Sequence, residues 1–180
     1  MSNEVSQDIR GVLIAVTGAR VLLPNATVAE VITYSPPDPI EGAPAWMLGR
    51  IRWRGWRLPV ISYARMIASA ENEGEFGAKV VVLKALGGNP RHSYFAMLTQ
   101  GFPRLVTVST NALERDEAAE IGDLAEDVPA EGVLMRVKLH DEQAVIPDLA
   151  AIQARIAELG AVSAARGRFS SPTAARIMRF

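Results

Sequence analysis

Short apolar runs separated by turn residues recur along this chain. The clearest example lies between Trp46 and Ile67, in the stretch WMLGRIRWRGWRLPVISYARMI. From Gly49 to Trp53 apolar and polar side chains alternate, which is typical of a strand with one buried face. Arg54-Gly55 interrupts the alternation, and glycine readily adopts the positive φ that a tight turn needs. The pattern therefore predicts a β-hairpin whose second strand is Trp56–Ile61, followed by a short helical turn.

Pro59 lies inside the second strand of this hairpin. Proline has no backbone N–H, so it cannot donate a hydrogen bond to a neighbouring strand. We therefore expect Pro59 to lie in an edge strand or at a β-bulge.

Other apolar runs of strand length lie on both sides of the hairpin. The predicted strands are Gly11–Val16, Val21–Leu23, Val28–Thr33, Lys79–Leu86, Tyr94–Thr99, Leu105–Ser109, Gly132–Leu139 and Gln143–Ile146. Asp148 is suited to cap a helix over Leu149–Leu159, whose apolar residues recur at helical spacing. Roughly ten short strands and little helix predict an all-β protein of small barrels with a C-terminal helix. The pattern alone does not distinguish two barrels from one sandwich.

Polar and proline-rich segments separate these elements. Met1–Arg10 is polar and is expected to be a flexible N-terminus, and Ser35–Pro44 contains four prolines and is expected to be an extended connection. Ser69–Gly77 predicts a loop that divides the chain into two subdomains. Glu114–Asp127 holds seven acids and one arginine and is expected to be a solvated loop. Gly160–Phe180 has four arginines and no acid, which favours a disordered or loosely docked basic tail.

Composition narrows the function classes. The chain has 180 residues, 49% of them hydrophobic, and a net charge of -1, which disfavours a generic nucleic-acid binder. The absence of cysteine excludes disulfides, thiolate metal sites and cysteine nucleophiles. No apolar run approaches the roughly 18 residues that span a bilayer, and the first residues lack the apolar core of a secretory signal. We therefore expect a cytoplasmic protein with no direct membrane insertion.

Signatures of enzymes are missing from the sequence. It contains no G-x-x-x-x-G-K-[ST] phosphate loop, no G-x-G-x-x-G, no G-x-S-x-G elbow and no histidine pair at metal-ligand spacing. We therefore predict a protein that is not an enzyme and has no cofactor or metal. One alternative stays open: an enzyme that uses exposed carboxylates, or Ser62 and Tyr63.

Arginines and tryptophans are concentrated in the predicted hairpin. Arg50, Arg52, Arg54, Arg57 and Arg65 fall within sixteen positions that hold no acid, and Trp46, Trp53 and Trp56 lie among them. One interpretation is a solvated strand face above core tryptophans. Another is a protein-docking surface, because Trp and Arg are enriched at binding hot spots. A third is a nucleic-acid-binding barrel, which the net charge and the lack of lysine in the hairpin disfavour.

Three segments resemble those of CheW-like domains, the adaptors of bacterial chemosensory arrays. They are the hairpin pattern LG-x-I-x-x-RG-x-x-LPVI, the opening GVLIAVTGARVLLPNATVAEVI and the late GVLMRVKLHDEQAVIPDL. They occur in the order typical of the family and cover roughly residues 11–159. The resemblance implies one domain made of two intertwined SH3-like five-stranded β-barrels packed on a shared apolar seam, with an approximate subdomain division near residues 69–77.

The resemblance also implies a function and a set of partners. A protein of this family would be a non-enzymatic scaffold that couples the cytoplasmic tip of methyl-accepting chemoreceptors to the regulatory domain of a CheA-type histidine kinase. The output would be chemotaxis or, in a pilus-linked system, twitching motility. No nucleic acid is expected as a partner.

The resemblance assigns candidate binding residues to this sequence. It places Glu30 beside Arg54 as an ion pair that fixes the groove between the barrels, where the receptor tip is held. Val28 and Gly49 match other family positions near that groove, and Gly49 would let a partner helix approach the backbone. Arg52 and Trp56 of the hairpin complete the candidate protein-binding set.

The sequence departs from the family pattern in three places. Ser62-Tyr63 replaces a common Asp-Leu, Arg52-Trp53 replaces a common Asn-Leu, and the tail after Leu159 is longer and more basic. The first two departures lie in or next to the docking hairpin. They leave the predicted fold intact and put the usual set of partners in doubt.

Overall fold

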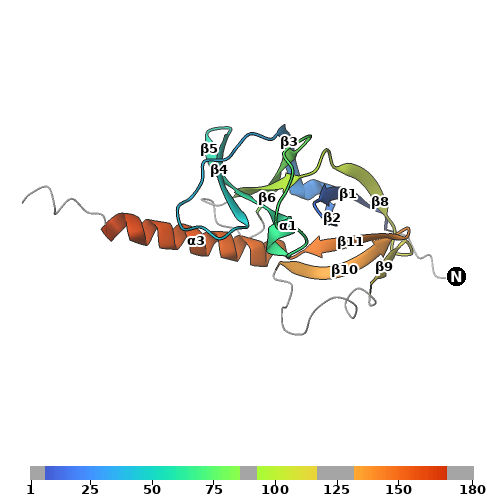
Figure 1. Cartoon of the computed structure of the whole chain (residues 1–180). Coiled ribbons are helices and arrows are strands. Elements are labelled where there is room, and N and C mark those ends of the chain that lie inside the picture. The colour runs from blue at the N-terminus through green and yellow to red at the C-terminus, as the bar shows by residue number, and fades with distance from the viewer. Residues whose placement is uncertain (1–6, 86–92, 117–131, 170–180) are drawn as a thin grey trace, which may run out of the picture.

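The computed structural model describes residues 7–85, 93–116 and 132–169, with side chains as far as residue 160 (Figure 1). The described residues form eleven strands in two sheets. The five-stranded sheet has the order β3-β6-β7-β5-β4 and the six-stranded sheet has the order β8-β1-β2-β11-β10-β9. The predicted β-rich fold with a C-terminal helix is therefore confirmed, with one strand more in the second sheet than expected.

Most strands lie where the apolar runs predicted them. The five-stranded sheet contains β3 (Val28–Thr33), β4 (Met47–Trp53), β5 (Trp56–Ile61), β6 (Lys79–Lys84) and β7 (Tyr94–Thr99). The six-stranded sheet contains β1 (Ile9–Val16), β2 (Ala19–Pro24), β8 (Arg104–Val108), β9 (Leu113–Arg115), β10 (Val133–Leu139) and β11 (Glu142–Pro147). A 3-10 turn (Asn25–Thr27) precedes β3, α1 (Tyr63–Met66) follows β5, and α3 (Leu149–Phe169) follows β11.

The two sheets share one strand arrangement. In each, a hairpin is followed by a helix: β4–β5 by α1, and β10–β11 by α3. The strand before the helix then pairs in parallel with a strand of another hairpin, as β5 does with β7 and β11 with β2. The stretches RLPVISYARMI and QAVIPDLAAIQARI, which look alike in sequence, therefore occupy equivalent places in the two sheets.

The two sheets do not follow one another along the chain with a boundary at residues 69–77. That segment connects α1 to β6 within the five-stranded sheet. The N-terminal hairpin β1–β2 instead joins the sheet formed by the C-terminal strands β8–β11. The sheets are thus interleaved along the chain, which residue periodicity does not reveal because it carries no information on which strands pair.

The main hydrophobic core lies between the two sheets. It combines Ile14 and Val21 of the six-stranded sheet with Val81 and Phe95 of the five-stranded sheet, and Ile152 of α3 lies in the same cluster. Each sheet also encloses a smaller cluster of its own. The predicted shared apolar seam is therefore present, and burial of this aliphatic surface is the principal stabilising contribution.

Pro59 does not lie in an edge strand, contrary to the prediction. Strand β5 has β7 on one side and β4 on the other, and β4 is the edge strand. The parallel pairing of β5 with β7 begins only at Val60, so Pro59 lies outside that short ladder. The irregularity of the hairpin falls in β4, between Met47 and Gly49.

The acidic run and the basic tail also differ from expectation. Residues 113–115 form the short strand β9, and Asp116 after it is buried, so the run does not begin as a solvated loop. The helix predicted to end at Leu159 continues to Phe169, and Figure 1 shows α3 extending beyond the sheets. Several alanines and the absence of proline before Pro172 favour this continuation. The predictions for residues 1–6, 117–127 and 170–180 fall outside the described residues.

Candidate functional site

A carboxylate connects the two edge strands of the five-stranded sheet. Glu30 lies on β3, and its Oε2 accepts a hydrogen bond from Trp53 Nε1 of β4 at 2.7 Å. The same oxygen lies 3.2 Å from Arg54 Nη2 in the turn between β4 and β5. Because β3 and β4 are the first and last strands of the sheet, these contacts close it into a barrel.

The expected Glu30–Arg54 ion pair is present, but its location corrects the prediction. Both residues belong to the five-stranded sheet, so the pair spans the edges of one barrel and does not lie between two barrels. The Arg54 side chain is 69% exposed and that of Glu30 is 37% exposed. The pair is therefore available to a partner at the surface, and its binding role stays a prediction.

The turn holds Arg54 in a defined position. Arg54 and Gly55 both have positive φ, 46° and 79°, as the central residues of a two-residue type I′ hairpin turn require. The Arg54 guanidinium lies 5.0 Å from the centre of the Trp53 ring, which is a cation–π contact. Trp53 is buried and its ring lies 5.0 Å from that of Tyr94. The exposed Arg54 side chain therefore packs on the buried ring of Trp53.

Gly49 has a structural role that the sequence did not indicate. Asp38 and Arg50 exchange two backbone hydrogen bonds of 2.9 Å, which attach the proline-rich connection to the outer edge of β4. A Cβ on Gly49 would lie 2.2 Å from the Asp38 carbonyl oxygen, and Gly49 has φ +140°. This chain's own backbone thus occupies the space beside Gly49. The expectation that Gly49 admits a partner helix is therefore wrong.

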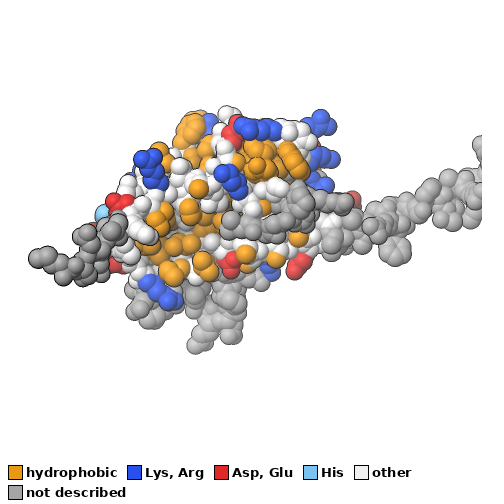
Figure 2. All heavy atoms as spheres, turned by 180° about the vertical axis from the view of Figure 1, so that it is seen from behind, with side chains coloured by type: hydrophobic (Ala, Val, Ile, Leu, Met, Phe, Trp, Pro, Cys, Tyr) orange, Lys and Arg blue, Asp and Glu red, His pale blue; other side chains and the backbone are white. Residues whose placement is uncertain are grey.

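The remaining candidates separate into two groups. Arg52 and Trp56 are exposed near the turn that carries Arg54, and Trp56 retains 43% of its accessible surface. Val28 is half-buried at the start of β3 and packs against the shared core. The structure thus gathers Glu30, Arg52, Arg54 and Trp56 at the hairpin turn, a group we call the turn cluster. Lys and Arg side chains also gather at the end of the molecule that carries β4 and β5 (Figure 2).

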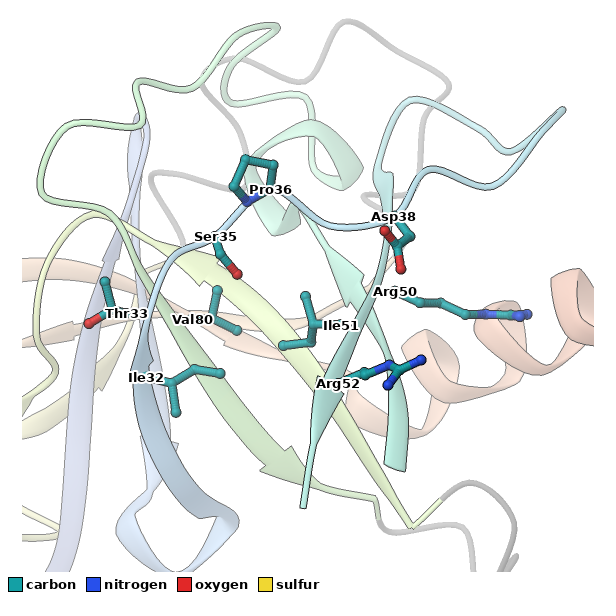
Figure 3. Close-up of a pocket in the computed structure, with 9 residues that line it drawn as sticks. All are labelled: Ile32, Thr33, Ser35, Pro36, Asp38, Arg50, Ile51, Arg52 and Val80. Carbon is teal, nitrogen blue, oxygen red and sulfur yellow. The ribbon is translucent and has the colours of Figure 1, made fainter. Parts of the chain in front are cut away.

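A pocket lies between β3 and β4, with the Glu30 contacts on one side and the Asp38–Arg50 backbone pair on the other. Its volume is about 220 Å³, and Ile32, Ile51 and Val80 point into it (Figure 3). Ser35 and Asp38 of the proline-rich connection lie at its rim. Arg50 and Arg52 of β4 also belong to the lining, so the pocket combines aliphatic side chains with one carboxylate and two arginines. Sequence reasoning missed it because it depends on how far the sheet curls.

Ser62 and Tyr63 serve the structure of α1 and the core. Ser62 is fully buried, and its Oγ accepts a hydrogen bond from Arg65 N at 3.2 Å and donates one to Glu73. Tyr63 is also fully buried, and its hydroxyl donates to the Gly132 carbonyl at 2.8 Å. Burial raises the pKa of Tyr63 well above its ordinary value. Both hydroxyls are buried and already engaged in structural hydrogen bonds, which disfavours the alternative of an enzyme built on this pair.

The described part of the chain contains no group of three or more His, Asp or Glu side chains arranged to hold a metal ion. None of its helices is both long enough and apolar enough to cross a membrane.

Comparison with known proteins adds a family and a fold. The sequence model of the CheW-like domain family matches residues 10–156. The crystal structure of the scaffolding protein TtCheW from Thermoanaerobacter tengcongensis superimposes with a TM-score of 0.63 at 15% sequence identity, covering 83% of this chain and 90% of that one. No curated protein matches the chain by sequence.

Proposed function

The chain belongs to the CheW-like domain family, and on this premise we propose that it is a non-enzymatic signalling adaptor that couples chemoreceptors to a CheA-type histidine kinase in a chemotaxis or twitching-motility pathway. The observation that carries the proposal is the Glu30–Arg54 ion pair, held at the surface by Trp53 in the motif positions that the family resemblance marks. The receptor tip would dock at the turn cluster.

The energetics of the ion pair favour a role in binding. An exposed pair contributes only about 0–1 kcal/mol to stability, so stability alone does not explain this arrangement. The contacts of Arg54 with Glu30 and with the Trp53 ring restrict its side chain before any partner arrives. Restricting a side chain in advance reduces the entropy lost on association. Arginine and tryptophan are also the residue types most often found at binding hot spots, and exposed Trp56 lies beside Arg54.

An adaptor of this kind acts by linking partners and needs no chemical step. A helix of the receptor tip would lie against apolar surface beside the turn cluster, a common mode of peptide recognition. The regulatory domain of the kinase would dock elsewhere on the sheets. Because linked binding events raise the effective concentration of each partner, modest individual affinities suffice in an array.

We predict that Arg54→Gln weakens binding of a purified soluble receptor hairpin fragment about tenfold, equivalent to about 1.4 kcal/mol. The melting temperature should change little, because the pair is exposed. Isothermal titration calorimetry measures the affinity, and circular dichroism measures the melting temperature.

Arg104→Gln is the matched control. Arg104 pairs with Glu142 in the six-stranded sheet, and the exposures of that pair, 59% and 37%, are close to those of Arg54 and Glu30. This variant removes the same charge and an equivalent ion pair, so it should bind the fragment like wild type. Equal loss of affinity in both variants would show a general charge effect and would overturn the assignment of the turn cluster.

A further inference from the structure

Three arginines lie together on the outer face of the β4–β5 hairpin. Arg50 and Arg52 of β4 share this face, where Arg52 lies directly opposite Arg57 of β5 and Arg50 lies opposite Pro59. Like charges directly opposite each other in an antiparallel pair are destabilising. The free protein therefore carries an unfavourable electrostatic arrangement here.

Acidic side chains of this chain compensate these arginines only in part. Asp38 Oδ2 lies 3.5 Å from Arg57 Nη2, and both side chains are largely exposed. Glu30, which also lies near the hairpin, is already engaged by Trp53 and Arg54. Among the described residues, Arg50 and Arg52 form no ion pair. An anionic partner would relieve this excess positive charge.

An apolar pocket adjoins the same face. Met47 and Pro59 line it from the hairpin, Ile156 and Leu159 line it from α3, and its volume is about 140 Å³. Arg50 and Arg57 belong to the same lining, and Arg50 also lines the β3–β4 pocket (Figure 3). The site thus combines space for an aliphatic side chain with two guanidinium groups.

The longer helix contributes to this pocket. The family match ends at residue 156, whereas Leu159 and Gly160 of α3 both line the pocket. The pocket therefore depends in part on residues that follow the matched region.

We propose that the outer face of the β4–β5 hairpin and the adjoining part of α3 bind an acidic segment of a partner protein. Its carboxylates would lie over Arg50, Arg52 and Arg57, and one aliphatic side chain would enter the pocket beside Leu159. Guanidinium groups bind carboxylates through charge-assisted hydrogen bonds, which gives the contact its specificity. The aliphatic anchor favours a peptide over a nucleic acid, whose phosphates would use the arginines without needing the pocket.

This surface rests on the proposed adaptor function, adjoins the turn cluster and shares Arg52 with it, so its test changes Arg50 and Arg57 and leaves Glu30, Arg52 and Arg54 unchanged. The probe is a fluorescein-labelled synthetic peptide with one central leucine among glutamates, titrated with the full chain and followed by fluorescence anisotropy. One control peptide has alanine in place of the leucine, and another has lysines in place of the glutamates. A single-stranded DNA oligonucleotide of equal length tests the nucleic-acid alternative.

Two sets of variants distinguish the contribution of the arginines from that of the apolar pocket. The double variant Arg50→Gln/Arg57→Gln should weaken binding of the leucine peptide roughly tenfold or more. Arg10→Gln/Arg20→Gln, which removes two exposed arginines from the six-stranded sheet, should leave binding within about twofold. Leu159→Asn, a change at a half-buried position of α3, should reduce binding of the leucine peptide to that of the alanine peptide. Melting curves check that every variant is folded.

Two results would overturn the inference. The first is that the leucine and alanine peptides bind equally well, or that neither binds better than the lysine peptide. The second is that the oligonucleotide binds as tightly as the leucine peptide and loses affinity in the Arg50→Gln/Arg57→Gln variant, which would make this face a nucleic-acid surface.

Discussion

At the scale of single residues, Gly49 joins the proline-rich connection to the hairpin. Because Gly49 has no side chain, the Asp38 backbone can approach it closely. The two backbone hydrogen bonds between Asp38 and Arg50 then join the proline-rich connection to the edge of β4. Near the hairpin turn, Glu30 of β3 joins β4 through its contacts with Trp53 and Arg54. Asp38 also lines the pocket, and the Glu30 contacts hold Arg54 of the turn cluster.

Gly49→Ala should destabilise the protein strongly. A non-glycine residue at this φ costs about 1–3 kcal/mol, and the 2.2 Å approach of its Cβ to Asp38 O adds a backbone clash. Chemical denaturation measures the loss. Gly55→Ala is the control, because Gly55 also has positive φ but has open space around its Cβ position. Equal losses in the two variants would contradict the proposed role of the contact with Asp38.

The contacts at this scale were only partly predictable. The Glu30–Arg54 pair followed from the family motifs, since both residues lie in matching segments. The bond from Trp53 to Glu30 and the approach of Asp38 to Gly49 did not, because they arise only when the sheet curls and brings its two edge strands together.

At the scale of elements, the helix caps explain one departure from the family pattern. Ser62 caps α1 by accepting from Arg65 N, as Asp148 caps α3 by accepting from Ala151 N at 3.0 Å. Serine and aspartate are both favourable N-cap residues. Ser62 can also donate to Glu73, which an ionised aspartate cannot do. Serine in place of aspartate thus suits the half-buried carboxylate of Glu73 beside it.

Ser62→Ala should lower the free energy of unfolding by about 2–3 kcal/mol, because it removes a cap and leaves Glu73 without its donor. Ser62→Asp should also have a lower free energy of unfolding than wild type, because it places a second carboxylate next to Glu73. Adding Glu73→Gln to Ser62→Asp should restore most of the loss in urea unfolding. If Ser62→Asp alone is as stable as wild type, Glu73 does not select serine at this position.

The hydrophobic periodicity of the sequence predicts most strands and helices. It does not predict those elements whose bounds depend on strand pairing or on helix propensity. Alternating and continuous apolar runs predicted ten of the strands, because a buried strand face requires them. The short β9 was missed because its three residues lie in an acidic context and are fixed only by pairing with β10. The basic composition after Leu159 predicts disorder, but the alanine content of the same segment favours helix, and α3 continues to Phe169.

At the scale of the whole molecule, the two sheets depend on each other. The N-terminal hairpin β1–β2 completes the sheet of the last strands, and the main core lies between the sheets. The two sheets therefore form one unit with a common hydrophobic core. Such a body suits a scaffold, which must hold two docking surfaces in a fixed relative position.

The proposed function requires this protein to bridge a receptor and a kinase physically. The most direct measurement is co-sedimentation of a purified CheA-type kinase with vesicles that carry the chemoreceptor, with and without this protein. We predict that wild-type protein brings the kinase into the pellet, that Arg54→Gln does so far less, and that Arg104→Gln behaves like wild type. Sedimentation of the kinase that is independent of this protein, or equal with all three forms, would contradict the account.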